Sequence, residues 1–307
     1  MGRGTAHYHG FKAVQGAFWV AMEETANATW LGDVASTFTT DQPSEEYPWL
    51  GQNPAMKLWD GERSYQELRG DRLVLINDDY EGTIEFKRSD FRRDKTGQLQ
   101  ARVGELADRA AQLPQKLIST LLLANGTDYT GGNFFSSHTV GAGTFNNQTT
   151  TNIGTPTAPT TAEMVAGILT ALNRFQVFTD DQGEPMHEFA RGFTIMVPPN
   201  MWTALIAALG DQFTSSGVSN TIAAVTQRGY SMMPVSNPRL GSTAIFYVFR
   251  NDARIGSMIY QEELVNLEVL GPDSEHAKKT NKVMMGAHIV SAAGYGRPEM
   301  VVQHTFT

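Results

Sequence analysis

Two histidines near the start of the chain have the spacing of metal ligands in a strand. His7 and His9 alternate with Tyr8, and alternate residues of a β-strand share one face, where they could chelate a metal ion. No carboxylate lies within ten residues of them to complete such a site. We therefore interpret both as exposed or packing side chains, and we predict no metal site.

Two pairs of neighbouring carboxylates, Asp78-Asp79 and Asp180-Asp181, have the residue types that serve acid/base catalysis or Mg²⁺ binding. Asn77 precedes the first pair, and Gln182-Gly183 follows the second. Aspartate is common in turns because its side chain bonds to the nearby backbone. We predict a turn at both places and no catalytic role.

Two further histidines could serve an enzyme. His187-Glu188 opens the H-E-x-x-H pattern of zinc proteases, but Arg191 stands where the second histidine belongs. His138 follows Phe134 and Phe135, and we interpret it as a packed loop histidine. A hydrolase that uses His187 or His138 with a nearby Asp remains an alternative, and it predicts a small oligomer with a buried polar pocket. The common phosphate, dinucleotide and nucleophile-elbow motifs are absent, so we predict no catalytic residue and no cofactor.

The composition is typical of a globular protein. Of the 307 residues, 41% are hydrophobic, but no apolar run approaches the roughly 18 residues that span a membrane. The first ten residues lack the apolar segment of a secretory signal. There are no cysteines, which excludes disulfides and thiolate metal sites and fits a reducing cytoplasm.

The net charge of −8 argues against tight nucleic-acid binding, which usually needs a basic stripe. The densest basic stretch, residues 87–95, is interrupted by Asp90 and Asp94. We expect at most a protein that surrounds nucleic acid without gripping it.

The clearest element is a long amphipathic helix over residues 99–123. Its apolar stripe has spacings of three and four and consists of Leu99, Val103, Leu106, Ala110, Leu113 and Leu117. Asp94 or Thr96 can cap its start, Pro114 should kink or restart it, and Asn125-Gly126 should end it.

The segments before this helix look incomplete on their own. Residues 1–50 are rich in Gly, Thr and aromatics, with a possible helix over 13–28, and such an arm buries little against itself. We expect it to lie on the body of the protein or on a neighbouring molecule. The β-prone runs 72–76 and 83–87 flank a turn-rich link, 77–82, and predict a projecting hairpin that is polar on both faces.

After the helix, residues 126–160 are Gly/Thr/Asn-rich and predict a long loop. Thr160 and Glu163 form a capping box for a helix whose inward residues are Val165, Ile168, Leu169, Leu172 and Phe175. Asn200 should cap a short helix over 201–209. Strands are predicted at 192–197, 232–235, 244–250, 257–261, 265–270, 283–290 and 300–306. This mixture predicts an α+β protein.

The order of these parts and their local sequences resemble those of the major head subunits of phage Mu and Mu-like prophages. The similar stretches are Trp49–Gly51, Met56–Arg63, Leu73–Phe91, Leu121–His138, Met258–Gln261 and Lys282–Tyr295 with Gly286, Gly294 and Gly296. The resemblance covers roughly residues 45–307 and is weak before them. The loop around His138 differs, because the family tends to have an acidic residue before this histidine and a proline after it.

The resemblance implies an α+β fold of the Hong Kong 97 type. Its expected parts are an N-terminal arm (1–55), an extended loop (56–92), a peripheral domain with the spine helix (93–150), an axial domain (151–252) and a return to the peripheral domain (253–307). It also implies a structural, non-enzymatic subunit of the phage virion.

Such subunits form pentamers and hexamers of an icosahedral head that encloses double-stranded DNA, assembled in the bacterial cytoplasm as a procapsid. The implied partners are a scaffold protein, a portal and, in some heads, a decoration protein, with no membrane. Neighbouring subunits would hold the arm and the loop over about 56–91. Some heads of this fold carry Lys–Asn cross-links, for which Lys57 and Lys87 are candidates, but Mu-like heads are not expected to use them. An encapsulin-like compartment shell is the alternative.

Overall fold

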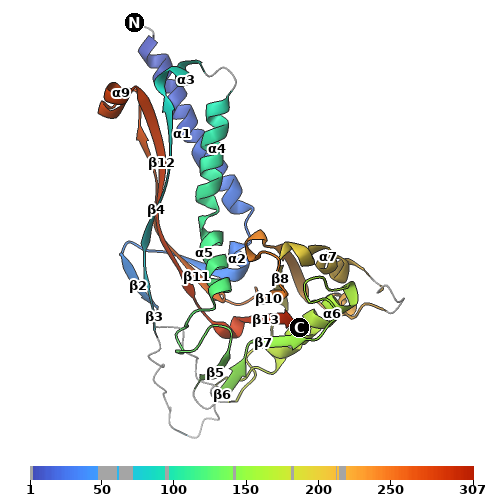
Figure 1. Ribbon diagram of the computed structural model, residues 1–307. Coiled ribbons are helices and arrows are strands. Elements are labelled where there is room, and N and C mark those ends of the chain that lie inside the picture. The colour runs from blue at the N-terminus through green and yellow to red at the C-terminus, as the bar shows by residue number, and fades with distance from the viewer. Residues whose placement is uncertain are drawn as a thin grey trace.

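The computed structural model describes residues 3–47, 61, 72–93, 97–140, 143–180, 183–211, 213 and 219–307. Figure 1 shows these residues in two connected parts. One part is elongated and combines long strands with long helices, and the other is a compact assembly of sheet and helices that holds the C-terminus.

The elongated part is built on a four-stranded sheet in the order β1, β11, β12, β4. Its strands are β1 (Ala35–Thr39), β4 (Asp78–Lys87), β11 (Met258–Leu270) and β12 (Lys282–Tyr295). β11 and β12 pair antiparallel, with an irregularity between Glu262 and Leu264. The runs predicted at 257–261 and 265–270 are therefore one strand, because a bulge bends a strand without ending it.

Three helices, α1 (Arg3–Asn27), α4 (Gln98–Ala111) and α5 (Leu113–Ala124), belong to this part (Figure 1). The predicted apolar stripe is confirmed in α4, since Val103, Leu106 and Ala110 are buried in one cluster with residues of β12. In α5 the buried apolar residues are Ile118 and Leu122, and Leu117 is half-buried. The long helix is divided at Gln112, and Pro114 stands in the first turn of α5, where its missing N–H leaves no helical bond unmade.

The two ends of the divided helix fit the sequence differently. Asn125 ends α5 in the left-handed conformation, with φ 45°, as predicted. At the start, Gly97 is the N-cap residue, which has no side chain to cap the helix. Asp94 and Thr96, the predicted caps, lie outside the described residues.

The predicted hairpin over 72–87 is wrong. β3 (Leu73–Ile76) pairs with β2 (Ser44–Tyr47), whereas β4 pairs along its whole length with β12. Tyr80, Ile84 and Phe86 of β4 pack against the cluster that contains α4, and the alternate residues are exposed. β4 therefore has one apolar face, and residues 78–82, predicted as part of a turn, begin the strand.

The leading segment lies on the body of its own chain, which is one of the two positions expected for it. Helix α1 packs along α4, and Phe18 is fully buried between them and the sheet. Ala21 and Met22 pack against the same cluster, and the Thr25 hydroxyl donates to Asp108 over 2.6 Å. These four positions of α1 have the spacing of one helical face.

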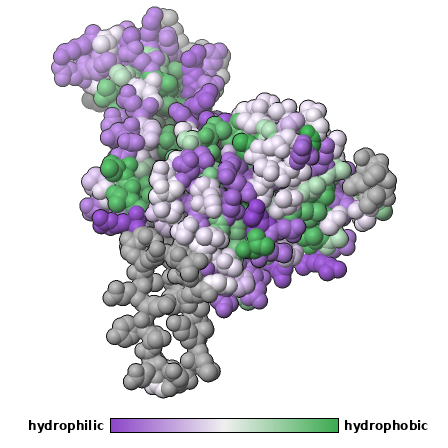
Figure 2. Space-filling view, turned by 60° about the horizontal axis from the view of Figure 1, so that its bottom comes forward, coloured by the Kyte–Doolittle hydropathy of each residue, from purple (hydrophilic) through white to green (hydrophobic). Residues whose placement is uncertain are grey.

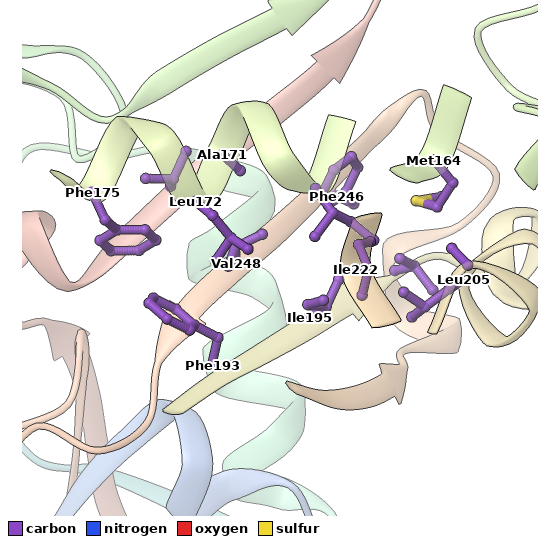
Figure 3. Packing of buried hydrophobic residues seen from close by; sticks show 14 of the residues in the cluster. Met164, Ala171, Leu172, Phe175, Phe193, Ile195, Leu205, Ile222, Phe246 and Val248 are labelled. Carbon is purple, nitrogen blue, oxygen red and sulfur yellow. The ribbon is translucent and has the colours of Figure 1, made fainter. Parts of the chain in front are cut away.

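The compact part contains a five-stranded sheet in the order β7, β13, β10, β8, β9. Its elements are β7 (Gln148–Thr151), β8 (Gly192–Val197), β9 (Ser231–Ser236), β10 (Ile245–Arg250), β13 (Val301–Phe306), α6 (Thr161–Gln176), α7 (Trp202–Gly210) and α8 (Thr221–Gln227). Figure 3 shows α6 above the sheet, with Leu172 and Phe175 pointing toward Phe193 and Val248. The predicted capping box at Thr160 and Glu163 is present.

Two local predictions in this region fail. The passage over 126–160 is not one loop, because it contains β5 (Ser137–Val140), β6 (Gly143–Asn146) and β7. Asn200 does not cap α7, since its amide donates to the carbonyls of Thr157 and Thr243. The remaining elements are α2 (Leu31–Val34), α3 (Arg88–Arg93), α9 (Glu275–Thr280) and the 3₁₀ helices η2 (Pro199–Met201), η3 (Pro238–Leu240) and η4 (Pro298–Met300).

Candidate functional site

His138 is packed as predicted, but it lies in strand β5 and not in a loop, where it belongs to a buried polar cluster. Its side chain and that of Asp128 are both fully buried, with His138 Nδ1 3.3 Å from Asp128 Oδ2. The Thr130 hydroxyl donates to Asp128 Oδ1 over 2.6 Å. Burial raises the pKa of Asp128, while the hydrogen bond from Thr130 and the charge of His138 oppose this rise.

The protonation of this cluster follows from its geometry. His138 Nε2 lies 3.1 Å from the carbonyl oxygen of Phe134, which can only accept, so Nε2 carries a hydrogen. His138 Nδ1 lies 3.1 Å from the Thr130 hydroxyl oxygen and 3.3 Å from Asp128 Oδ2. A catalytic histidine needs one ring nitrogen that faces the substrate. Here both nitrogens contact groups inside the protein, so the pair joins β5 to the passage that holds Asp128 and cannot activate a nucleophile in this arrangement.

His187 has an equally unfavourable position for a general base. Its Nδ1 lies 3.0 Å from Nη1 of Arg250, a cation that always donates. Burial and then the charge of Arg250 lower the pKa of His187 to about 3. The Arg250 Nε donates in turn to Asp252 over 2.6 Å, so the carboxylate contacts the arginine and does not orient the histidine. The hydrolase alternative therefore lacks a suitable histidine–aspartate pair at either position.

The carboxylate pairs have different surroundings. Asp180 accepts a hydrogen bond from the backbone N–H of Glu184 over 2.8 Å, which confirms the predicted turn there, and Asp181 lies outside the described residues. Asp79 is in strand β4 and contacts His288 Nε2 at 2.9 Å on the exposed face of the sheet. The turn predicted at Asp78-Asp79 is therefore wrong.

The structure describes some, but not all, of the remaining candidate residues. His7 and His9 lie in helix α1 and not in the strand that the chelation pattern assumed. Within the residues that the structure describes, no group of His, Asp and Glu is arranged to hold a metal ion. Lys57 lies outside them, and Lys87 is exposed at the end of β4.

The feature that most clearly calls for a partner is the outer face of the β2–β3 pair. Its inner face is buried through Tyr47 and Leu75 against Ile259 and Ala292 of the large sheet. On the outer face, Val74 is 51% exposed and Ile76 is 70% exposed. Figure 2 shows hydrophobic residues gathered on this flank, whereas the far end of the elongated part is mostly hydrophilic.

The position of this face is fixed by specific contacts. The Tyr47 hydroxyl donates to Gln261 over 2.7 Å, and Gln261 donates to Asn77 over 2.7 Å. Gly294 lies under Leu75, and a Cβ at position 294 would overlap a methyl group of that leucine. Because Tyr47 and Leu73 are paired, the chain leaves β2 and re-enters β3 at the same end of the pair. Sequence patterns did not reveal this face, because two exposed aliphatic residues in a strand look the same as two buried ones.

Comparison with known proteins connects these features. A family model, that of the Mu-like prophage major head subunit gpT, matches residues 9–165. The match begins well before residue 45, so it extends to residues in which the sequence resemblance is weak. The major capsid protein of Escherichia phage Mu is 34% identical over 104 residues, which cover 33% of this chain and 34% of that protein. The chain thus aligns with only about a third of the length of this relative.

Solved structures agree over a larger part of the chain. The procapsid subunit of bacteriophage JBD30 matches 96% of this chain and 74% of its own, with a TM-score of 0.54 and 18% identity. The capsid subunit of cyanophage P-SCSP1u matches 91% of this chain and 88% of its own, with a TM-score of 0.59 and 13% identity. The α+β fold of the Hong Kong 97 type, expected from the resemblance, is confirmed. The chain, whose residues 9–165 match the family model, belongs to the family of Mu-like prophage major head subunits.

Proposed function

We propose that this chain is the major capsid protein of a tailed bacteriophage and that it assembles into the pentamers and hexamers of an icosahedral head. The observation that carries the proposal is the family match over residues 9–165, in a chain of which 91–96% matches solved capsid structures. The role is structural. In it the buried clusters at His138 and His187 stabilise the subunit, and no catalytic residue or cofactor is required.

The two exposed aliphatic residues of β3 support self-association, on a face that they share with Ser44 and Glu46 of β2. Val74 and Ile76 stand side by side on it, and apolar groups gain free energy when a neighbour removes them from water. A modest contact of this kind suffices in a closed shell, because each subunit makes several contacts at once. In this proposal a second copy covers the face. It replaces the predicted hairpin over 72–87 as the element that needs a neighbour.

The remaining parts of the proposal concern partners and place. The head would form in the host cytoplasm around a scaffold protein, with a portal at one vertex, and would enclose double-stranded DNA without reading its sequence. A decoration protein could bind outside. The net charge of −8 suits a wall that surrounds DNA without gripping it. No helix in the described ranges is long and apolar enough to cross a membrane.

The five-part division of the chain is kept as a proposal. The peripheral domain would combine residues 93–150 with 253–307, and the axial domain would span 151–252. Within the proposed loop segment, 56–92, β3 and β4 are assigned to sheets. Within the proposed arm, 1–55, α1 packs on α4 of its own chain.

Expression of the full chain followed by sedimentation and electron microscopy tests the proposal. We expect shells with pentamers and hexamers, and we expect V74D and I76D to reduce their yield at unchanged subunit stability. The matched controls are T221D and S231D, which add the same charge at exposed polar positions. A monomer that never assembles, alone or with the other head proteins of its phage, would contradict the proposal. Small shells that hold proteins and no DNA after infection would favour the compartment alternative.

A further inference from the structure

A groove runs along the elongated part between strand β4 and the helices α4 and α5. It consists of a cavity of about 1170 Å³ and an adjoining one of about 450 Å³. Both are lined by Leu106, Arg109 and Gln112, so they form one continuous channel. β4 is the last strand of its sheet among the described residues, and this side of the sheet is therefore open.

The floor of the groove is apolar. Ile84 and Phe86 of β4 face Leu99 and Leu106 of α4 across it, and Leu113 of α5 continues the floor into the smaller cavity. Of these side chains Leu106 is the most deeply buried, and the others are half-buried. A second chain laid in the groove could cover the exposed parts of all of them.

A row of cations stands along the helical wall. Arg102 and Arg109 line the larger cavity, and Arg109 and Lys116 line the smaller one. They are seven residues apart, so they lie on one side of the helix at intervals of about 10.5 Å. Gln112, at the division between α4 and α5, keeps right-handed helical angles. All three side chains are exposed, and in the part of the chain that the structure describes none has an ion-pair partner.

The spacing of this row matches a helix better than a strand. Carboxylates seven residues apart on a helix that runs along α4 and α5 repeat at the same interval of about 10.5 Å. Residues on one face of a strand repeat at about 6.8 Å and would soon lose register with the cations. The apolar floor beside the row suits the apolar stripe of the same helix, which is the helix-in-groove mode of recognition.

Two observations distinguish the possible occupants. Carboxylates also line the groove, and they would repel the unbroken negative charge of a nucleic-acid backbone, whereas a polypeptide can place neutral or basic residues opposite them. They are Glu85, Asp90, Glu105 and Asp108 in the larger cavity and Asp79 and Glu81 in the smaller one. No helix of the described chain carries two carboxylates seven residues apart. A second copy therefore does not supply the matching helix from those elements.

We propose that the groove between β4 and α4–α5 binds an acidic amphipathic helix of a different protein, whose carboxylates at seven-residue spacing pair with Arg102, Arg109 and Lys116 while its apolar stripe covers the groove floor. The proposal does not depend on the capsid assignment, because it rests only on the groove and its charges.

A synthetic helical peptide tests this surface directly. The probe has roughly three heptads, with glutamate at one heptad position and leucine at two, and its binding to the unassembled full chain is followed by fluorescence anisotropy. We expect the peptide to bind, with an affinity that falls as salt is added. The variant R102E/R109E/K116E should bind it about tenfold more weakly, since each exposed ion pair contributes a factor of roughly two or more. Hydrogen exchange should slow in residues 79–87 and 98–116 when the peptide binds.

Matched variants and probes make the test specific. The control R228E/R254E/K278E reverses three exposed cations elsewhere and should bind the peptide normally. A peptide with lysines in place of its glutamates should bind the reversed-charge variant better than the unmodified chain. If the reversed variant is unstable, R102Q/R109Q/K116Q replaces it. The proposal is overturned if the unmodified chain does not bind the peptide, if both triple variants lose affinity equally, or if a single-stranded oligonucleotide binds the groove more tightly than the peptide.

Discussion

Replacing Gly294 by alanine should loosen the β2–β3 pair from the body of the subunit. Gly294 lies in β12 opposite Ile259, and the Leu75 side chain occupies the space where a Cβ would be, with its second methyl group 3.2 Å from that position. Leu75 is buried in a small cluster, so it cannot move aside without exposing apolar surface. The added methyl group must therefore push β3 outward.

The cost can be set against known core substitutions. Adding a methyl group to a filled site destabilises by about 1–3 kcal/mol, whereas L75A alone should cost about 2–5 kcal/mol through lost burial and a cavity. In the double variant the alanine at position 75 leaves room for the new methyl group. The effects should therefore not add, and the double variant should be about as stable as L75A.

Urea unfolding of the unassembled chain measures these free energies, and hydrogen exchange in β3 reports the local loosening. G104A is the control, because a Cβ at position 104 of helix α4 meets no neighbour, and it should stabilise by about 0.5–1 kcal/mol. If G294A and L75A are strictly additive, Leu75 does not occupy the space above Gly294 and the described packing is wrong.

Two further predictions concern other buried side chains. F18A should release helix α1, because Phe18 is its only fully buried residue with a described side chain. We expect rapid proteolysis within residues 3–27 while α4 stays protected. If the whole elongated part unfolds cooperatively instead, the prediction that α1 detaches alone is wrong. Burial lowers the pKa of His187 to about 3, so this side chain is compatible with the folded state only when it is neutral. The free energy of unfolding should therefore be highest above about pH 6.5 and should fall by up to about 4–5 kcal/mol as the pH drops toward 3. H187Q should flatten this acid dependence in denaturation curves recorded at several pH values, and an unchanged dependence would exclude His187 as its source.

Elements with a strong local signal were predictable from the sequence. The capping box at Thr160 and Glu163, the stop at Asn125 and the restart at Pro114 all depend on residues close in sequence. Their physical causes, an unpaired backbone group or a restricted backbone angle, act over one helical turn. Strand β8 was predicted with its bounds because a short apolar run between turn residues has few alternatives.

Pairing between distant segments was not predictable in the same way. β4 was read as half of a hairpin with residues 72–76, yet its partner is β12, some two hundred residues later. The charges of β4 seemed to cover both faces because Asp78 and Asp79 are adjacent, although only one face of the strand is exposed. Helix α1 was underestimated for a related reason, since its buried face is recognisable only once α4 is beside it.

For the candidate functional residues, the sequence indicated which side chains are packed but did not identify their partners. The packing of His138 was predictable, but its place in strand β5 was not. Its partner Asp128 was not identified, because Asp-Tyr-Thr is a common turn sequence. Gly294 and Tyr295, noted at first only as part of a resemblance, have clear physical roles. Gly294 admits Leu75, and the Tyr295 hydroxyl accepts from Gly126 over 2.6 Å and donates to Leu121 over 2.8 Å.

These polar contacts explain how the two parts of the subunit keep a defined relation. Directed hydrogen bonds join α5 to the compact part, from the Tyr247 hydroxyl of β10 to the Leu122 carbonyl over 3.3 Å and from the Asn237 amide to the Ser119 hydroxyl over 2.9 Å. An apolar contact tolerates sliding, whereas a buried hydrogen bond loses its stabilisation when its angle changes and leaves an unsatisfied group. A subunit that tiles a closed shell must present its contacts at fixed angles, because small errors accumulate around a ring. Buried polar groups that catalyse no reaction can therefore serve assembly by fixing the direction of the spine helix relative to the compact part.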